Sequence, residues 1–309
     1  MSNLSSPVIW ALAGVYGLLI FSTILVKVLR SQTGSDYQEL GERIKSWWIM
    51  VAIFTFAIAV STTISILFLA FISFLAFKEF LSMVPTRQAD RRVIFWGFVA
   101  IPIQFFWVSV GWYGMFIIFI PVYMFLLIPA RMVLAAKTDG FLKAAGTLHW
   151  GLMTTVFSLS HAAFLLALPS ENNLAGGAGL LFFLVFLTQF NDVAQFTWGK
   201  LFGRHPVVPK VSPKKTIEGL LGGVLTSVFA AWLIAPYLTP LNSLEALGAG
   251  LLIGISGFLG DVVISAIKRD IGVKDSGALI PGHGGIMDRV DSLTFTAPLF
   301  FHFIYYLHY

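Results

Sequence analysis

Long apolar segments alternate with short clusters of cations along the chain. The apolar segments cover about residues 8–26, 46–77, 93–130, 144–199, 216–267 and 293–309. A membrane-spanning helix needs about 20 mostly apolar residues. The three central segments from 93 to 267 therefore have room for two helices each. The segment 46–77 is expected to hold two short or tilted helices that turn at Ser61-Thr-Thr, so the pattern predicts a bundle of nine or ten helices.

The composition supports a membrane protein and excludes a soluble globular one. Hydrophobic residues make up 57% of the 309 residues and charged residues only 11%, against about 25% charged in a typical soluble domain. The apolar runs are continuous rather than alternating, which predicts spanning helices and not a β-barrel. The expected fold class is an all-α polytopic membrane protein. The chain has no Cys, which excludes disulfides, thiolate metal sites and a cysteine nucleophile.

The positions of the cations predict the topology. All twenty Lys and Arg lie in five clusters, at 27–45, 78–92, 131–143, 200–215 and 268–289. Because cytoplasmic loops carry the excess of Lys and Arg, we expect every cluster to be cytoplasmic and both termini to lie outside. The first apolar segment has its cations after it, so we expect a retained helix rather than a signal peptide. The protein is thus expected to be a multi-pass protein of the inner (plasma) membrane.

Residues that can carry chemistry concentrate after residue 190, which suggests N-terminal membrane helices over 1–190 and a catalytic membrane region over 191–309. Asp192 follows an apolar helix that we expect to end near Phe190, and Asp261 lies inside another apolar segment. A carboxylate at bilayer depth costs roughly 2.5–3.5 kcal/mol on insertion scales, so it needs a metal, a cation or a water-filled cavity. The alternatives are a salt bridge between helices for Asp261 and a solvated helix end for Asp192.

The loop from Gly199 to Gly219 carries five cations together with Ser212 and Thr216. Lys200 and Lys215 could neutralise a polyphosphate, and the helix that starts near Thr216 offers free N–H groups. The other interpretation is a cytoplasmic loop that contacts lipid headgroups, and this loop alone does not decide between them.

A second loop, over residues 265–292, alternates acids and bases around Pro281-Gly-His-Gly-Gly. Asp288 and Asp291 are three residues apart, so on a helix they share a face and, with Asp261, could hold Mg²⁺. His283 could donate to a phosphate or act as an acid or base, although a single loop histidine often does neither. Metal-binding acids beside phosphate-neutralising cations are typical of phosphoryl or nucleotidyl transfer.

The stretch Ser265–Asp291 resembles the signature of phosphatidate cytidylyltransferases (CDP-diacylglycerol synthases). The matching residues are Ser265, Lys268, Arg269, Lys274, Asp275, Pro281, His283, Gly284, Gly285, Asp288, Arg289 and Asp291. An upstream block is also similar, at Asn191, Asp192, Gly199, Lys200, Gly203, Pro209, Lys210, Ser212, Pro213, Lys215, Thr216, Glu218 and Gly219. The two blocks cover roughly the last 120 residues.

The resemblance implies a membrane enzyme, commonly dimeric, that converts CTP and phosphatidate to CDP-diacylglycerol and diphosphate with Mg²⁺ in phospholipid biosynthesis. The resemblance further implies three sets of site residues. The metal ligands, for two expected divalent sites, are Asp261, Asp288 and Asp291. The catalytic set is Asp261, Asp288, Lys268, Arg269 and His283. The substrate-binding set is Asn191, Asp192, Lys200, Ser212, Lys215, Thr216, Lys274, Asp275 and Arg289.

Two departures from the family pattern concern the acceptor lipid more than the reaction. Ile264 stands where many members carry an acid, and the residues after Asp192 read Val-Ala-Gln-Phe where many members have a small residue and Tyr. The alternatives are a CTP-dependent lipid kinase, a cytidylyltransferase for another lipid phosphate, and an ion-coupled transporter that uses Asp192 and Asp261. The expected partners are CTP, a lipid phosphate and the bilayer, and no nucleic acid.

Overall fold

The computed structural model describes residues 4–33, 38–87, 90–134, 136–169, 175–277 and 284–309. Its first helices are α1 (Ser6–Thr33), α2 (Gln38–Val60), α3 (Thr62–Met83), α4 (Arg91–Ser109), α5 (Tyr113–Ile118), the π-helix η2 (Phe119–Met124) and α6 (Phe125–Val133). Next come α7 (Phe141–Leu152), the π-helix η3 (Met153–Phe157), α8 (Ser158–Phe164), the 3₁₀ turn η4 (Leu165–Ala167) and α9 (Gly176–Phe202). The remaining elements are β1 (Pro206–Val208), β2 (Ser212–Thr216), α10 (Ile217–Leu238), α11 (Ser243–Asp270), α12 (Met287–Val290) and α13 (Leu293–His308).

Within the described ranges, nine helical stretches are long and apolar enough to cross a membrane. The run from α5 to α6 forms one of them, and the run from α7 to η4 forms another. The C-terminal α13 has 16 residues and is shorter than a typical span. The prediction of an all-α polytopic bundle with about nine to ten helices is confirmed.

The segment 46–77 does contain two helices, as predicted. They meet at Ser61, whose Oγ accepts a hydrogen bond from the backbone N–H of Ile64 (3.2 Å) and caps the start of α3. A serine in this position satisfies one of the free N–H groups at a helix start. The observed turn therefore follows from local capping chemistry.

The expected helix end near Phe190 is wrong. Helix α9 continues to Phe202, so Asp192 lies inside it. Its carboxylate accepts a hydrogen bond from Ser292, about one hundred residues further along the chain. Because the carboxylate has this partner inside the protein, Asp192 does not have to lie at a solvated helix end. The loop expected from Gly199 consequently starts later, and it contains an antiparallel hairpin in which Pro206 pairs with Thr216.

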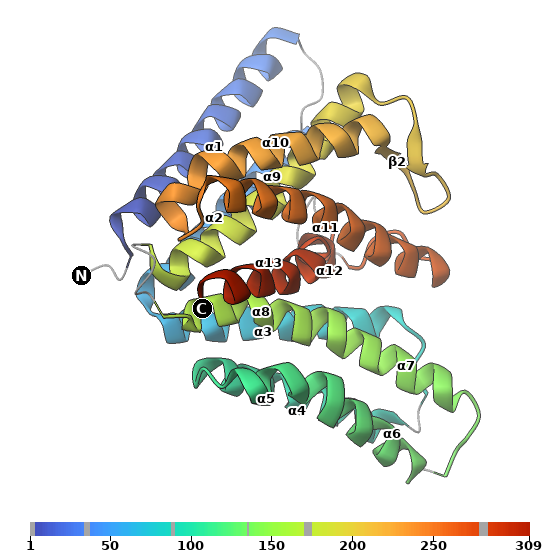
Figure 1. The fold of residues 1–309 in the computed structure, drawn as a ribbon. Coiled ribbons are helices and arrows are strands. Elements are labelled where there is room, and N and C mark those ends of the chain that lie inside the picture. The colour runs from blue at the N-terminus through green and yellow to red at the C-terminus, as the bar shows by residue number, and fades with distance from the viewer. Residues whose placement is uncertain (1–3, 34–37, 88–89, 135, 170–174, 278–283) are drawn as a thin grey trace.

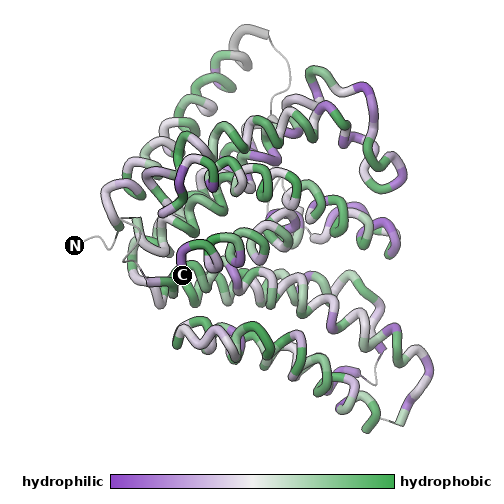
Figure 2. Tube along the Cα trace, in the orientation of Figure 1, coloured by the Kyte–Doolittle hydropathy of each residue, from purple (hydrophilic) through white to green (hydrophobic). Residues whose placement is uncertain are grey.

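Helices α9, α10 and α11 pack side by side, and α13 lies between α11 and α8 (Figure 1). The close packing depends on small residues. A Cβ on Gly223 of α10 would overlap the side chain of Gln195 on α9. Most residues along the helices are hydrophobic, whereas hydrophilic residues gather at the β-hairpin and at the C-terminal end of α11 (Figure 2).

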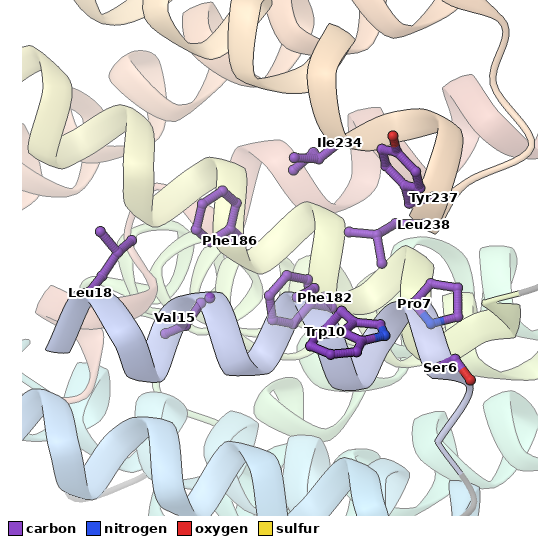
Figure 3. A pocket seen from close by; sticks show the side chains of 12 residues that line it. Ser6, Pro7, Trp10, Val15, Leu18, Phe182, Phe186, Ile234, Tyr237 and Leu238 are labelled. Carbon is purple, nitrogen blue, oxygen red and sulfur yellow. The ribbon is translucent and has the colours of Figure 1, made fainter. Parts of the chain in front are cut away.

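Helix α1 packs less closely than the others. An apolar groove of about 700 Å³ opens between α1, α9 and α10. Figure 3 shows Trp10 and Val15 on α1 facing Phe182 and Phe186 on α9. Gly14 also lines the groove, and no atom lies within 4 Å of the place its Cβ would take.

Candidate active site

Three aspartates from separate elements come together at one level of the bundle. Asp192 lies in α9, Asp261 in α11, and Asp291 directly after α12. Ser292 joins two of them, because its Oγ donates to Asp192 Oδ1 (3.0 Å) and its N–H to Asp291 Oδ1 (2.7 Å). The approach of α11 requires Gly260, whose Cβ would lie 2.6 Å from the carbonyl oxygen of Asp291.

The electrostatics of this group favour a cation. Asp291, which lies outside the nine spans, is buried, and burial raises its pKa well above the ordinary value. The negative charges of Asp261 and Asp192 raise the pKa further, while the Ser292 N–H and Lys268 lower it. Carboxylates that disfavour one another's charge in this way are stabilised by a bound cation. We call Asp192, Asp261 and Asp291 the acid group.

Two lysines neutralise two of the aspartates that the sequence singled out. Lys215 Nζ lies 2.6 Å from Asp261 Oδ2 and also sits over the ring of Phe258 at 4.8 Å. Lys268 Nζ lies 2.7 Å from Asp288 Oδ1. The residues expected to hold phosphate and those expected to hold metal are therefore brought together as ion pairs.

Asp288 differs from the acid group in its surroundings. Besides Lys268, its carboxylate accepts the backbone N–H groups of Ser276 (3.0 Å) and Gly285 (3.1 Å). Burial raises the pKa of Asp288, but the Lys268 and backbone hydrogen bonds outweigh it, so the pKa lies below the ordinary value. The acids that face one another are thus Asp192, Asp261 and Asp291, whereas the sequence suggested Asp261, Asp288 and Asp291.

Glu79 of α3 is a site residue that the sequence reasoning missed. Its carboxylate accepts the backbone N–H groups of Ile286 (2.8 Å) and Met287 (3.3 Å) and the hydroxyl of Ser276. These contacts join the N-terminal helices to the segment between α11 and α13. The available signal was weak, because Glu79 is the single acid between residues 43 and 89 and stands beside Lys78 in a cationic cluster.

The hairpin loop is held by its own polar contacts. Thr216 Oγ1 accepts the N–H of Gly219 (3.1 Å) and caps α10. Glu218 accepts the N–H of Arg204 (3.0 Å) and contacts His205 Nδ1 (2.6 Å). Arg269 Nε donates to the carbonyl oxygen of Val211 (3.3 Å), which ties α11 to the hairpin. The two motif-bearing loops therefore meet at one end of the bundle.

The other predicted residues fall into three situations. Lys200, Lys274 and Asp275 are exposed, and Ser212 is half-buried in β2. Asn191 is fully buried, and its side chain bonds to the Gly254 carbonyl on α11 (3.2 Å) and the Ser227 hydroxyl on α10 (3.1 Å), so it ties three helices together.

Arg289 and His283 complete the set. Arg289 Nε is buried and has no hydrogen-bond partner among the described residues, so it is a donor available to an anion. His283 lies outside the described residues.

Comparison with known proteins identifies the family of this chain. A sequence model described as the cytidylyltransferase family matches residues 41–307. The chain belongs to the cytidylyltransferase family. This confirms the resemblance that the two motif blocks indicated. Among its relatives, this cytidylyltransferase-family chain is 49% identical to the uncharacterized protein YnbB of Escherichia coli (strain K12), over 97% of this chain and 99% of that one.

Relatives named phosphatidate cytidylyltransferase match a shorter part. The identity is 51% to the protein of Synechocystis sp., over 37% of this chain and 39% of that one. It is 43% to the protein of Staphylococcus aureus (strain COL), over 38% of this chain and 45% of that one. The chain thus aligns with less than half of the length of these phosphatidate cytidylyltransferases.

Proposed function

We propose that this membrane protein transfers a cytidylyl group from CTP to phosphatidate and forms CDP-diacylglycerol and diphosphate. The observation that carries the proposal is the pairing of Lys215 with Asp261 and of Lys268 with Asp288 beside the acid group, in a chain of this family. Cations and hard oxygen ligands side by side are what a displacement at a phosphorus atom needs.

In the reaction, a phosphate oxygen of phosphatidate attacks the α-phosphorus of CTP. A new P–O bond forms, the bond between the α-phosphorus and the bridging oxygen breaks, and diphosphate leaves with that oxygen. Lys215 and Lys268 can turn from their aspartates to the phosphates, and Arg289 Nε is a further donor with no partner among the described residues. Their role is to bind and orient the negatively charged groups.

The acid group fits Mg²⁺ by its chemistry. Asp192, Asp261 and Asp291 offer carboxylate oxygens, the ligands that Mg²⁺ prefers. Burial, and after it the negative charges of Asp261 and Asp192, raise the pKa of Asp291. In the described ranges, no three acids or histidines are already arranged as a metal site. Asp261 would have to release Lys215 to bind an ion. A bound Mg²⁺ would supply charge neutralisation at the triphosphate.

Asp288 fits a metal less well than the acid group does. Both of its oxygens already accept hydrogen bonds, from Lys268 on one side and from two backbone N–H groups on the other. We therefore propose Asp192 in place of Asp288 as the third acid near the metal, with Asp261 and Asp291 as expected from the sequence.

The location of the site agrees with a lipid substrate and a soluble nucleotide. Asp192 and Asp261 lie in the C-terminal halves of the long apolar helices α9 and α11, about nine to ten residues before these helices end. Hydrophilic residues gather beyond those ends (Figure 2). We propose that this end faces the cytoplasm, at the inner (plasma) membrane, because CTP is there and the cations follow the positive-inside rule. Ile264, which is buried on α11, is the departure from the family pattern that bears on which lipid phosphate is accepted.

Product analysis tests the proposal. Purified protein in detergent receives phosphatidate, Mg²⁺ and CTP labelled at either the α- or the γ-phosphate. We expect the α-label in a CDP-lipid, the γ-label in diphosphate, and neither product in excess chelator. A γ-label in the lipid would show a CTP-dependent lipid kinase instead. Full turnover in excess chelator would contradict the metal requirement.

A further inference from the structure

We propose that Glu79 is a positioning residue that holds the described ends of the loop between α11 and α12, at Ser276 and at Ile286, in place for the reaction. The inference rests on the proposed function for its kinetic test. It concerns a side chain from the N-terminal helices that lies outside both sequence motifs.

Two carboxylates fasten both ends of this loop. At its start, Ser276 donates its N–H to Asp288 (3.0 Å) and its hydroxyl to Glu79. At its end, Gly285 donates its N–H to Asp288 (3.1 Å), and Ile286 donates its N–H to Glu79 (2.8 Å). We call Glu79, Ser276, Gly285 and Asp288 the clasp. Its hydrogen bonds hold Ser276 and Gly285, which are nine positions apart in the sequence, close to the same two carboxylates.

The glycines at the end of the loop make room for these carboxylates. A Cβ on Gly285 would overlap the carboxylate of Glu79. Gly284 has a φ of 77°, and its Cβ would lie 2.6 Å from Asp288 Oδ2. A positive φ is accessible to glycine at little cost. The Gly-Gly pair is thus explained by the approach of two carboxylates, and nothing about it requires a direct contact with substrate.

Glu79 is well placed to fix the loop because its helix is itself fixed. Phe77 and Phe80, on either side of it in α3, are fully buried. Phe77 packs so closely against Gly97 of α4 that a Cβ there would lie 2.9 Å from the ring, and Phe80 does the same to Gly151 of α7 at 2.6 Å. The carboxylate therefore projects from a rigid part of the bundle.

The clasp acts on the acid group through the chain. Asp288 belongs to the clasp, and Asp291 follows it by three residues in the turn that contacts Gly260. Glu79 also accepts the N–H groups that begin α12, which would otherwise lack a partner at the helix start. Without Glu79 we expect the loop to loosen and Asp291 to lose its fixed position relative to Asp261.

The test compares Glu79→Ala with Lys78→Ala, a matched control at the neighbouring exposed residue. Because small displacements of reacting groups can cost about 10²-fold in rate, we expect kcat for CDP-lipid formation to fall on the order of 10²-fold in Glu79→Ala only. The KM for CTP should change much less, since α9 and α10 keep their places. Glu79→Gln should recover part of the rate, because its amide oxygen can still accept the N–H group of Ile286 and its NH₂ group can donate to the Ser276 hydroxyl, although the acceptor for the Met287 N–H is lost.

A second readout does not depend on activity. The chain has no Cys, so a nitroxide on Lys274→Cys reports the mobility of the loop start. We expect Glu79→Ala, and not Lys78→Ala, to increase that mobility. Parental mobility and parental kcat in Glu79→Ala would overturn the inference. If the parent forms no CDP-lipid, the proposed function fails while the mobility comparison still tests the clasp. Should Glu79→Ala not fold, Ser276→Ala removes one clasp hydrogen bond, and parental values in that variant would overturn the inference equally.

Discussion

Replacing Asp288 by Asn separates a clasp role from a metal-ligand role. A carboxylate that only binds metal is repelled by the neighbouring carboxylates when the site is empty. From the sequence alone we would therefore expect Asp288→Asn to leave the free energy of unfolding unchanged or to increase it slightly. The contacts of Asp288 reverse this expectation. Its carboxylate is paired with Lys268, and the two side chains are only 8% and 10% exposed. It also accepts two backbone N–H groups.

The magnitude follows from those contacts. Removing one partner of a buried ion pair costs about 3–5 kcal/mol, because the other charge stays buried. An Asn oxygen can still accept some of the hydrogen bonds, but its NH₂ group then faces another donor. We therefore expect a loss of about 2–4 kcal/mol in the free energy of unfolding. At about 2–4 °C per kcal/mol for a large chain, Tm should fall by roughly 5–15 °C.

Asp291→Asn is the matched control. Its amide oxygen can keep the hydrogen bond from the Ser292 N–H, while the substitution removes one of three mutually repelling charges. Without metal, we expect its Tm to equal or slightly exceed that of the parent.

The assay is thermal unfolding in detergent, with and without Mg²⁺. A ligand at 100 times its Kd stabilises the folded state by about 2.7 kcal/mol. Mg²⁺ should therefore raise the Tm of the parent and of Asp288→Asn alike, and that of Asp291→Asn less. The reasoning is refuted if Asp288→Asn is as stable as the parent without metal and loses the stabilisation by Mg²⁺.

Two further predictions concern topology and packing. Lys210 lies in the hairpin before α10, and Ser243 begins α11 after it; both are exposed. Single cysteines at these two positions should react with an impermeant reagent from opposite sides of the membrane. Labelling from the same side would contradict the expected topology. Gly14→Leu should leave Tm unchanged or raise it, because the new side chain enters an apolar groove. Gly223→Leu should lower stability by at least about 1–3 kcal/mol, because α10 has no room for it against Gln195; equal Tm values for the two variants would contradict this packing.

Local signals in the sequence account for the parts of the fold that were predicted correctly. The spans follow from runs of apolar residues, and the turn at Ser61 follows from a capping side chain next to its helix. The family assignment followed from motif residues at fixed spacing.

The errors share one physical cause, which is contact between residues far apart in the chain. Asp192 appeared to end a helix because its partner Ser292 cannot be seen in the surrounding sequence. Glu79 and Ile286 are 207 residues apart, and neither spacing nor hydropathy connects them. The sequence could thus name Asp261, Asp288 and Asp291, but not which of them face one another.

The two lysine–aspartate pairs also bear on how the proposed substrates would bind. Lys215 has one ammonium group, and it lies 2.6 Å from the carboxylate of Asp261. This single charge cannot neutralise Asp261 and a phosphate equally well at the same time. A triphosphate that draws Lys215 away leaves Asp261 without its counter-charge, next to Asp192 and Asp291. Under the proposed function, that change would strengthen the binding of a divalent cation to the acid group, and by linkage a bound cation would strengthen the binding of the triphosphate by the same factor. Under the proposed function, the Lys215–Asp261 pair would therefore neutralise Asp261 while the site holds neither ligand, and would couple the binding of nucleotide to the binding of metal.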